Sequence, residues 1–312
     1  MKRVVVLRNA SASGADAALD DALSLIRDVG IEAQVHTPES PDHMRFLIRA
    51  EAKTVDAVVV GGGDGTINCA LKAVLECGLP LGILPLGTAN DLARTLGIPF
   101  DLESACTLIA SQTTRTIDVG WANNRPFVNA AGIGLSTQVA RRLSVDTKRA
   151  LGPFSYASAV AEALRSHRPF RASIACESGI REVSSIQITV GNGIYYGGGT
   201  PLAEDAAIDD GRLDLYSVRP QSLPRLIAVA FAVRRGTQRQ LGSGIDTASG
   251  AEFEIATRPR LTVSLDGEPA LHTPVRFRLA PRALTVFAPP QRERSIMADR
   301  ASDHLGTRSA PP

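Results

Sequence analysis

The first part of the chain alternates short apolar runs with longer segments in which apolar residues recur at helical spacing. Runs 3–8 and 31–36 have the length and composition of strands, and segments 14–29 and 43–53 have the pattern of amphipathic helices. Further strand-like runs follow at 57–60, 81–84 and 114–119. Strands that alternate with helices in this way predict an α/β domain with a parallel sheet.

The pattern changes after about residue 122. A long helical segment, interrupted at Gly152-Pro153, is predicted over 136–167. Short strands separated by Gly and Pro turns then predict an antiparallel sheet or sandwich. These strands are expected at 170–176, 182–190, 212–218, 252–257, 260–265, 275–279 and 284–288. We therefore expect two domains, 1–122 and 123–282, and a disordered tail of charged, Ser, Ala and Pro residues over 291–312.

A glycine-rich turn follows the third apolar run, where residues 58–68 read Val-Val-Val-Gly-Gly-Gly-Asp-Gly-Thr-Ile-Asn. Glycines let backbone N–H groups approach a ligand, and a helix opening at Gly65 or Thr66 would direct its free N–H groups at the same place. This favours phosphate, and Asp64 beside it favours an accompanying Mg²⁺ ion. An ordinary strand-to-helix turn is the alternative, because the Gly-x-Gly-x-x-Gly and Gly-Lys-Ser/Thr patterns are absent here.

A second turn of similar kind follows the next apolar run, where residues 85–94 read Pro-Leu-Gly-Thr-Ala-Asn-Asp-Leu-Ala-Arg. Thr88, Asn90 and Asp91 are all competent helix N-caps, so capping alone is one interpretation. However, neighbouring strands of an open α/β sheet place their carboxyl ends along one crevice, where ligands bind. The two turns are therefore expected to line one nucleotide from two sides.

A third motif, Asp266-Gly267-Glu268, follows the strand-like run 260–265. The three motifs, in this order and spacing, resemble the diacylglycerol kinase catalytic family, which includes bacterial lipid kinases and the sphingosine and ceramide kinases. The resemblance spans about residues 3–290. It implies an α/β N-terminal domain with a parallel sheet, like that of NAD kinases and diacylglycerol kinases, plus a mostly antiparallel β-sandwich C-terminal domain. It also implies that the last strand, about 283–290, returns to the first domain.

The resemblance implies an ATP- and Mg²⁺-dependent lipid kinase that transfers the γ-phosphate to a lipid hydroxyl of diacylglycerol type, with ATP in the interdomain cleft. Glu268 is the expected general base, since a carboxylate after a strand and a Gly turn can project into a cleft. The alternative is an exposed Glu in an Asp-Gly hairpin turn. Asp64 is the second catalytic candidate, and Asp64 and Asp91 are candidate Mg²⁺ carboxylates. Asp266 either assists or only shapes the turn.

The remaining nucleotide contacts are inferred from the resemblance. The turn 9–13 reads Asn-Ala-Ser-Ala-Ser, where family members usually carry Asn-Pro, so Ala10 departs from the pattern. Thr37 matches another nucleotide-contact position, although a strand-end Thr facing solvent is equally consistent. The expected nucleotide-binding residues are Asn9, Ser11, Thr37, Gly62, Gly63, Asp64, Gly65, Thr66, Asn68, Thr88 and Asp91.

A glycine-rich stretch, 197–199, precedes an Asp210-Gly211 pair. In some bacterial relatives of the family this loop holds a structural Mg²⁺ ion. The ligands carried over are the Asp210 carboxylate and the main-chain carbonyls of Ala207 and Arg212, and oxygen ligands suit a hard cation. An ordinary Asp-Gly turn is the alternative.

Composition narrows the class of partner. The chain has 312 residues, a net charge of +2 and 4% aromatic residues, which offers neither the charge nor the stacking surface of a nucleic-acid binder. Four cysteines without Cys-x-x-Cys spacing are typical of a reducing compartment.

The most apolar helical stretch, 226–233, is too short to span a bilayer. We therefore expect a cytoplasmic protein that visits a membrane surface transiently to meet its lipid. The basic segment 141–149 either faces anionic headgroups or is the solvated face of a helix.

Two other functions stay open. An NAD kinase-like enzyme would share the first motif, although the second and third motifs fit lipid kinases better. A non-catalytic nucleotide- or lipid-binding regulator is the other, favoured by Ala10 and by Cys69, where the family often has an acid. The intact Asp64, Asp91 and Glu268 argue against it. The sequence does not name the lipid, and it leaves the oligomeric state open, a homodimer included.

Overall fold

The computed structural model describes the chain except for residues 10–15, 138–167, 202–205, 223–224, 227–243 and 291–312. Three expectations therefore lie outside the described residues. These are the nucleotide contact of Ser11, the basic segment 141–149 with most of the predicted long helix, and the disordered tail. None of the described helices is long and apolar enough to cross a membrane.

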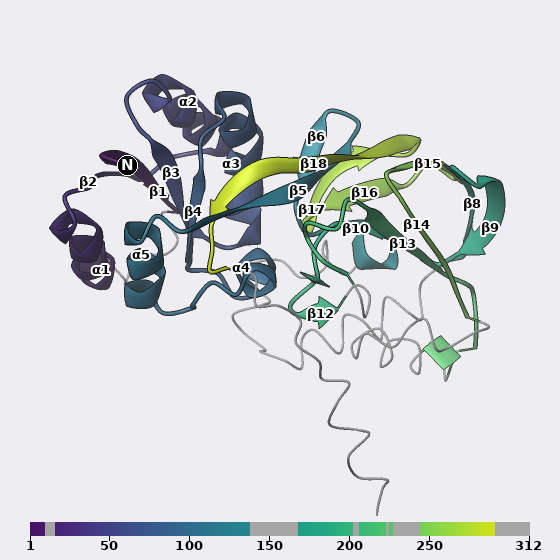
Figure 1. Ribbon diagram of the computed structural model, residues 1–312. Helices are drawn as coiled ribbons and strands as arrows, with labels where there is room; N and C mark the ends of the chain where they lie inside the picture. Colours follow the sequence, from purple (N-terminus) through teal and green to yellow (C-terminus); the bar gives the residue numbers. More distant parts are fainter. Residues whose placement is uncertain (10–15, 138–167, 202–205, 223–224, 227–243, 291–312) are drawn as a thin grey trace, which may run out of the picture.

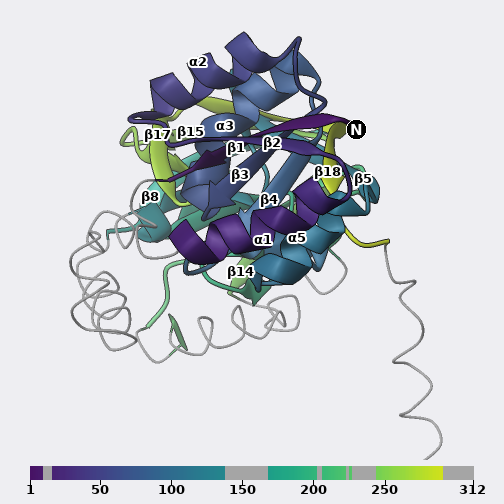
Figure 2. The ribbon, with the colours of Figure 1, turned by 90° about the vertical axis from the view of Figure 1, so that its left-hand side faces the viewer.

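The N-terminal part is a parallel sheet covered by helices on both faces. Its strands are β1 (Arg3–Arg8), β2 (Glu32–His36), β3 (Ala57–Gly62) and β4 (Leu81–Pro85), in the order β2-β1-β3-β4. Helices α1 (Asp16–Asp28) and α5 (Leu102–Ala110) cover one face, and α2 (Pro41–Glu51) and α3 (Asp64–Cys77) cover the other (Figure 2). The strands β3 and β4 are buried along their whole length, which explains their continuous apolar runs.

A long pair of antiparallel strands connects this sheet to the rest of the molecule (Figure 1). Strand β18 (Val275–Phe287) pairs with β5 (Thr114–Ala122) and reaches β4 through Val286 and Leu81. The expectation of two strands at 275–279 and 284–288 is wrong, because one strand continues through a register shift between Ala280 and Leu284. Strand β5 pairs with β18 on both sides of the shift. The sequence around Pro281 does not reveal this pairing, because a proline within a run usually indicates the end of a strand. The division into domains at residue 122 stays a prediction, since this sheet runs through both parts.

The C-terminal part is an antiparallel sandwich. One layer continues the first sheet from β18 through β15 (Glu252–Arg258) and β8 (Phe170–Cys176) to β9 (Gly179–Ser185). The other layer has the order β14-β13-β10-β7-β16-β17. Its strands are β7 (Ala130–Gly134), β10 (Gln187–Gly191), β13 (Leu213–Val218), β14 (Ile245–Gly250), β16 (Thr262–Leu265) and β17 (Glu268–His272). Side chains of both layers form one core, in which Phe127 packs edge-to-face on Phe277 with ring centroids 6.1 Å apart.

Four short elements complete the described part of the chain. Helix α4 (Asp91–Leu96) follows the second turn, and β6 (Arg125–Phe127) follows β5. The strands β11 (Tyr195–Tyr196) and β12 (Thr200–Pro201) form a small hairpin that contacts α4. The predicted run 182–190 is in fact divided between β9 and β10, which belong to different layers of the sandwich.

Candidate active site

The two glycine turns lie in backbone contact. A Cβ at Gly87 would stand 2.4 Å from Gly63 Cα, and a Cβ at Gly62 would stand 2.5 Å from Thr66 Cβ. Neither position has room for a side chain. Gly87 is required by the close approach of the two turns where β3 and β4 end, and Gly62 is required by the Thr66 side chain on the first turn of α3. The backbones of Gly63 and Gly87 therefore meet where the two turns come together, with the Asn90 side chain bonded to Gly87, and we call these two turns the cradle.

Helix α3 begins at this surface. Its first residue is Asp64 and its N-cap is Gly63, which provides no side-chain cap, so the helix starts slightly earlier than the sequence predicts. The first N–H groups of a helix lack an intrahelical acceptor, and the helix dipole adds partial positive charge there. The N–H groups of Thr66 and Ile67 donate to the Gly63 carbonyl, at 2.9 and 3.1 Å, so the start of α3 offers an anion chiefly the positive end of the helix dipole and the backbone before Thr66. These residues fit the phosphates of a nucleotide.

The Asp64 carboxylate connects the first turn to the second. It accepts hydrogen bonds from the backbone N–H groups of Asp91 and Leu92, both at 3.0 Å, and from Asn129 Nδ2 at 3.1 Å. It thus caps the N-terminus of α4, where Asn90 lies in the left-handed region at φ 49° and has no side-chain cap bond of its own. Both oxygens of Asp64 already carry donors, so a metal would use only its remaining lone pairs.

Asp91 holds a loop of the C-terminal part. Its carboxylate accepts hydrogen bonds from the N–H groups of Gly198 at 2.9 Å and Gly199 at 2.6 Å. Burial raises the pKa of the Asp91 carboxyl, and the charge of Asp64 raises it as well, against the opposite effect of the two N–H groups. Gly197, Gly198 and Gly199 all have positive φ, which other residues rarely adopt.

The third motif lies against the first turn of α3. Glu268 is exposed at the start of the edge strand β17, and a Cβ at Gly65 would stand 3.5 Å from its Oε1 atom. Within the described residues no hydrogen bond or ion pair engages the Glu268 side chain, in contrast to the carboxylates of Asp64 and Asp91. Among the described residues, Glu268 is thus a carboxylate without such a partner beside the first turn of α3, a position from which a general base could act.

Asp266 fixes the turn that carries Glu268. Its carboxylate accepts hydrogen bonds from the backbone N–H groups of Val128, Asn129 and Ala130, at 3.1, 2.8 and 3.1 Å. Burial raises the pKa of the Asp266 carboxyl to about 6, although these N–H groups lower it. The turn itself has positive φ at Asp266 and Gly267, 47° and 90°. Asp266 therefore shapes the turn, which is one of the two roles expected for it.

The nucleotide contacts expected from the resemblance divide into three groups. Asn9 and Thr66 come together, with Asn9 Nδ2 donating to Thr66 Oγ1 at 3.3 Å. Thr88 is exposed on the second turn, and Thr37 is exposed at the end of β2, where its Oγ1 accepts from Arg8 Nε at 3.1 Å. Asn68 instead donates to Asp266 Oδ2 at 2.8 Å. The nucleotide-binding roles of these residues stay predictions.

The Asp210 loop is closed by its own polar groups. The Asp210 carboxylate accepts from the backbone N–H groups of Ala207 and Arg212, both at 3.2 Å, and Arg212 Nε lies 3.3 Å from it. Burial raises the pKa of the Asp210 carboxyl. No cluster of three or more His, Cys, Asp or Glu side chains that could hold a metal occurs in the described part of the chain. The metal site formed by the Asp210 carboxylate and the main-chain carbonyls of Ala207 and Arg212 stays a prediction. A metal ion there would compete with the Arg212 guanidinium for the Asp210 carboxylate.

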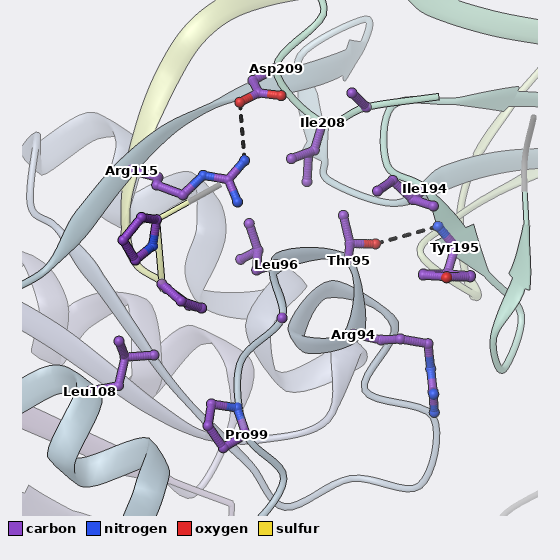
Figure 3. Close-up of a pocket in the computed structure, with 14 residues that line it drawn as sticks. Arg94, Thr95, Leu96, Pro99, Leu108, Arg115, Ile194, Tyr195, Ile208 and Asp209 are labelled. Carbon is purple, nitrogen blue, oxygen red and sulfur yellow. Dashed lines mark hydrogen bonds and ion pairs between the residues drawn. The ribbon is translucent and has the colours of Figure 1, made fainter. Parts of the chain in front are cut away.

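A pocket of about 850 Å³ is lined on one side by Arg94, Thr95 and Leu96 of α4 (Figure 3). Thr95 Oγ1 accepts a hydrogen bond from the Tyr195 N–H at 3.4 Å, and Arg115 pairs with Asp209 at 3.1 Å across its wall. Its lining includes none of the glycines of the two turns and not Glu268. The three α4 residues line the pocket, whereas Asp91, at the start of the same helix, contacts Asp64 and the glycine loop 197–199.

Comparisons with known proteins agree with this arrangement. Residues 3–122 match the diacylglycerol kinase catalytic domain, and residues 129–288 match the YegS C-terminal NAD kinase beta sandwich-like domain. The "Probable lipid kinase YegS-like" of Klebsiella pneumoniae (strain 342) is 36% identical over 276 residues, covering 87% of this chain and 91% of that protein. The "Probable lipid kinase YegS" of Escherichia fergusonii is 35% identical over 279 residues, with the same coverage, 87% and 91%. A crystal structure of "a putative diacylglycerol kinase" from Bacillus anthracis str. Sterne has a TM-score of 0.78 at 26% identity, covering 93% of this chain and 96% of that one.

The parallel α/β domain, the β-sandwich and the three motifs that meet between them define a lipid kinase. The chain belongs to the family of lipid kinases that combine the diacylglycerol kinase catalytic domain with a YegS-type C-terminal domain. The predicted family and fold class are confirmed.

Asn129 is a residue at the site that the sequence analysis did not predict. It is 3% exposed and contacts both Asp64 and Asp266. The one signal available was an isolated polar residue in the apolar run 126–133, Pro-Phe-Val-Asn-Ala-Ala-Gly-Ile. Such a residue is buried and must find partners, but its partners are not visible in the sequence.

Proposed function

We propose that the protein transfers the γ-phosphate of ATP to a hydroxyl group of a diacylglycerol-like lipid, with Glu268 as the general base. The observation that carries the proposal is the Glu268 carboxylate beside Gly65 in the first turn of α3, which no hydrogen bond or ion pair engages within the described part of the chain. The phosphates would bind the backbone of the Gly62-Gly63 turn and the N-terminus of α3. Glu268 would then accept the proton of the lipid hydroxyl as that oxygen attacks the γ-phosphorus.

A Mg²⁺ ion would neutralise the charge that develops on the phosphates. Asp64 and Asp91 are the carboxylates to hold it, through their remaining lone pairs or bound water, because N–H donors already occupy each of their oxygens. Their hydrogen bonds also give them a structural task, which is to hold α4 and the glycine loop around the cradle.

The lipid is proposed to enter from the side of the β-sandwich, because Glu268 lies on the edge strand β17 of that domain. The acceptor's chains remain in a membrane or micelle, so the protein would associate with the membrane surface transiently.

The proposal is tested with radiolabelled ATP and Mg²⁺ against mixed micelles of dioleoylglycerol, phosphatidylglycerol or sphingosine, with NAD as a soluble acceptor. Labelled lipid extracted into organic solvent supports the proposal and identifies the acceptor class. Label on NAD alone would replace it with an NAD kinase activity. ATP binding without transfer to any acceptor would favour the non-catalytic regulator.

A further inference from the structure

Asn129 connects the first motif to the third. Its side-chain Nδ2 donates to Asp64 Oδ1 at 3.1 Å, and its backbone N–H donates to Asp266 Oδ1 at 2.8 Å. The residue immediately precedes strand β7, which pairs with β16 and so adjoins the turn that carries Glu268. One buried residue therefore contacts the carboxylates on both sides of the site.

Asn68 makes a second connection between the same motifs. It lies on α3 one turn after Asp64, and residues four apart on a helix share a face. Its Nδ2 donates to Asp266 Oδ2 at 2.8 Å. Asp64, Asn68, Asn129 and Asp266 thus form a closed ring, in which each asparagine donates to a carboxylate of the other part of the molecule. The ring fixes the N-terminus of α3 against the turn that carries Glu268.

Stability alone does not account for the Asn129 side chain. Its Oδ1 atom is buried and has no hydrogen-bond partner among the described residues. An unpaired buried acceptor lowers stability, and an apolar side chain of similar size would avoid that loss. What asparagine provides here is the N–H donor to Asp64, a contact that bears on the geometry of the site.

We infer that Asn129 and Asn68 are positioning residues for phosphoryl transfer, which hold the Glu268 carboxylate at a fixed place relative to the first turn of α3. The inference rests on the proposed function, in which that turn holds phosphate and Glu268 accepts the proton. The Asn129 amide bonds Asp64 and the Asn68 amide bonds Asp266, so both side chains bear on the distance between α3 and the turn that carries Glu268. Displacement of a reacting group by about 1 Å costs on the order of 100-fold in rate.

The first test compares three alanine variants of the full-length protein, using labelled ATP and the acceptor that the wild type phosphorylates, dioleoylglycerol micelles first. Asn129→Ala and Asn68→Ala are expected to lower kcat by about 10-fold or more while the KM for ATP changes less than about 3-fold. Asn124→Ala, in the exposed turn between β5 and β6, is the matched control and is expected to match the wild type. A kcat within about 2-fold of wild type for both ring variants overturns the inference.

A double-mutant cycle separates positioning from a general structural effect. If Asn129 acts through Glu268, the Asn129→Ala/Glu268→Gln double variant retains a kcat within about 3-fold of Glu268→Gln alone, because no base remains to be positioned. A double variant slowed by the product of the two single effects overturns the inference. Should Asn129→Ala fail to unfold cooperatively, Asn129→Ser and Asn68→Ala are judged by the same criteria. A wild type that phosphorylates no acceptor contradicts the proposed function itself, whereas an active wild type with unaffected ring variants contradicts only this inference.

Discussion

The carboxylate of Asp64 accepts a hydrogen bond from the backbone N–H of Asp91 at 3.0 Å. The acids of the first two motifs are therefore joined in one series of hydrogen bonds. Asp91 continues the series, because its carboxylate accepts from the N–H groups of Gly198 and Gly199. These contacts lead from the first glycine turn, through Asp91, to the glycine loop 197–199 of the C-terminal part. Glu268 takes no part in this series of contacts, and it is the carboxylate that we propose as the general base.

Gly65→Ala is predicted to separate activity from stability. The new Cβ would stand 3.5 Å from Glu268 Oε1, an ordinary contact that narrows the space between the cradle and the base. Alanine in place of a helical glycine stabilises by roughly 0.5–1 kcal/mol, so the melting temperature should hold or rise. We expect kcat to fall by about 10-fold or more, since near-attack geometry is disturbed. Thermal unfolding measures stability and initial rates measure activity. Unchanged activity would contradict the proposal that the acceptor hydroxyl reacts between Gly65 and Glu268.

Gly87→Ala is predicted to damage the cradle itself. Its Cβ would stand 2.4 Å from Gly63 Cα, so the two turns must separate. Overpacking of this kind typically costs about 1–3 kcal/mol, and ATP affinity should fall with it. Gly250→Ala is the control, because its Cβ would lie 3.8 Å from Phe253 and is expected to be tolerated. Calorimetric titration with ATP checks the prediction, and wild-type affinity in Gly87→Ala would contradict it.

The Asp266 carboxyl is predicted to make stability depend on pH. Burial raises its pKa from 3.8 to about 6 in the folded protein, so the folded state binds the proton more tightly than the unfolded state does. The resulting stabilisation is fully present below about pH 4 and is lost as the pH rises through about 6, a change of up to about 3 kcal/mol. Asp266→Asn lacks this titration. The difference in unfolding free energy, wild type minus variant, should therefore decrease between pH 4.5 and pH 7.5 in urea titrations, as these pKa values require. A difference in unfolding free energy that stays constant or increases over this pH range would contradict the raised pKa of Asp266.

The sequence predicts the N-terminal sheet well because its strands are short buried runs between punctuating turns. The adjacency of the two glycine turns also follows from sequence, since β3 and β4 are consecutive parallel strands. The continuous strand β18 does not follow, because Pro281 and the local polarity indicate a break. The strand continues past Pro281 because it pairs on both sides of the register shift with β5, which lies more than 150 residues earlier in the chain.

The site is less predictable than the fold because its contacts join distant segments. Asn68 belongs to the first motif by sequence, yet its side chain bonds Asp266, 198 residues later. Asn129 belongs to no motif and bonds Asp64 from 65 residues away. Such hydrogen bonds depend on the packing of the sandwich against α3, which no local pattern of residues specifies.

The most direct test of the proposed mechanism is the steady-state rate of lipid phosphorylation by Glu268→Gln, beside the wild type and Glu182→Gln. Glu182 is an exposed glutamate on the edge strand β9 of the other layer, so it controls for loss of a charge at a strand edge. Removal of a general base typically costs about 100- to 10,000-fold in kcat, with ATP binding largely retained. The account predicts that loss for Glu268→Gln and wild-type rates for Glu182→Gln. A Glu268→Gln enzyme that phosphorylates lipid within a few-fold of the wild-type rate would contradict it.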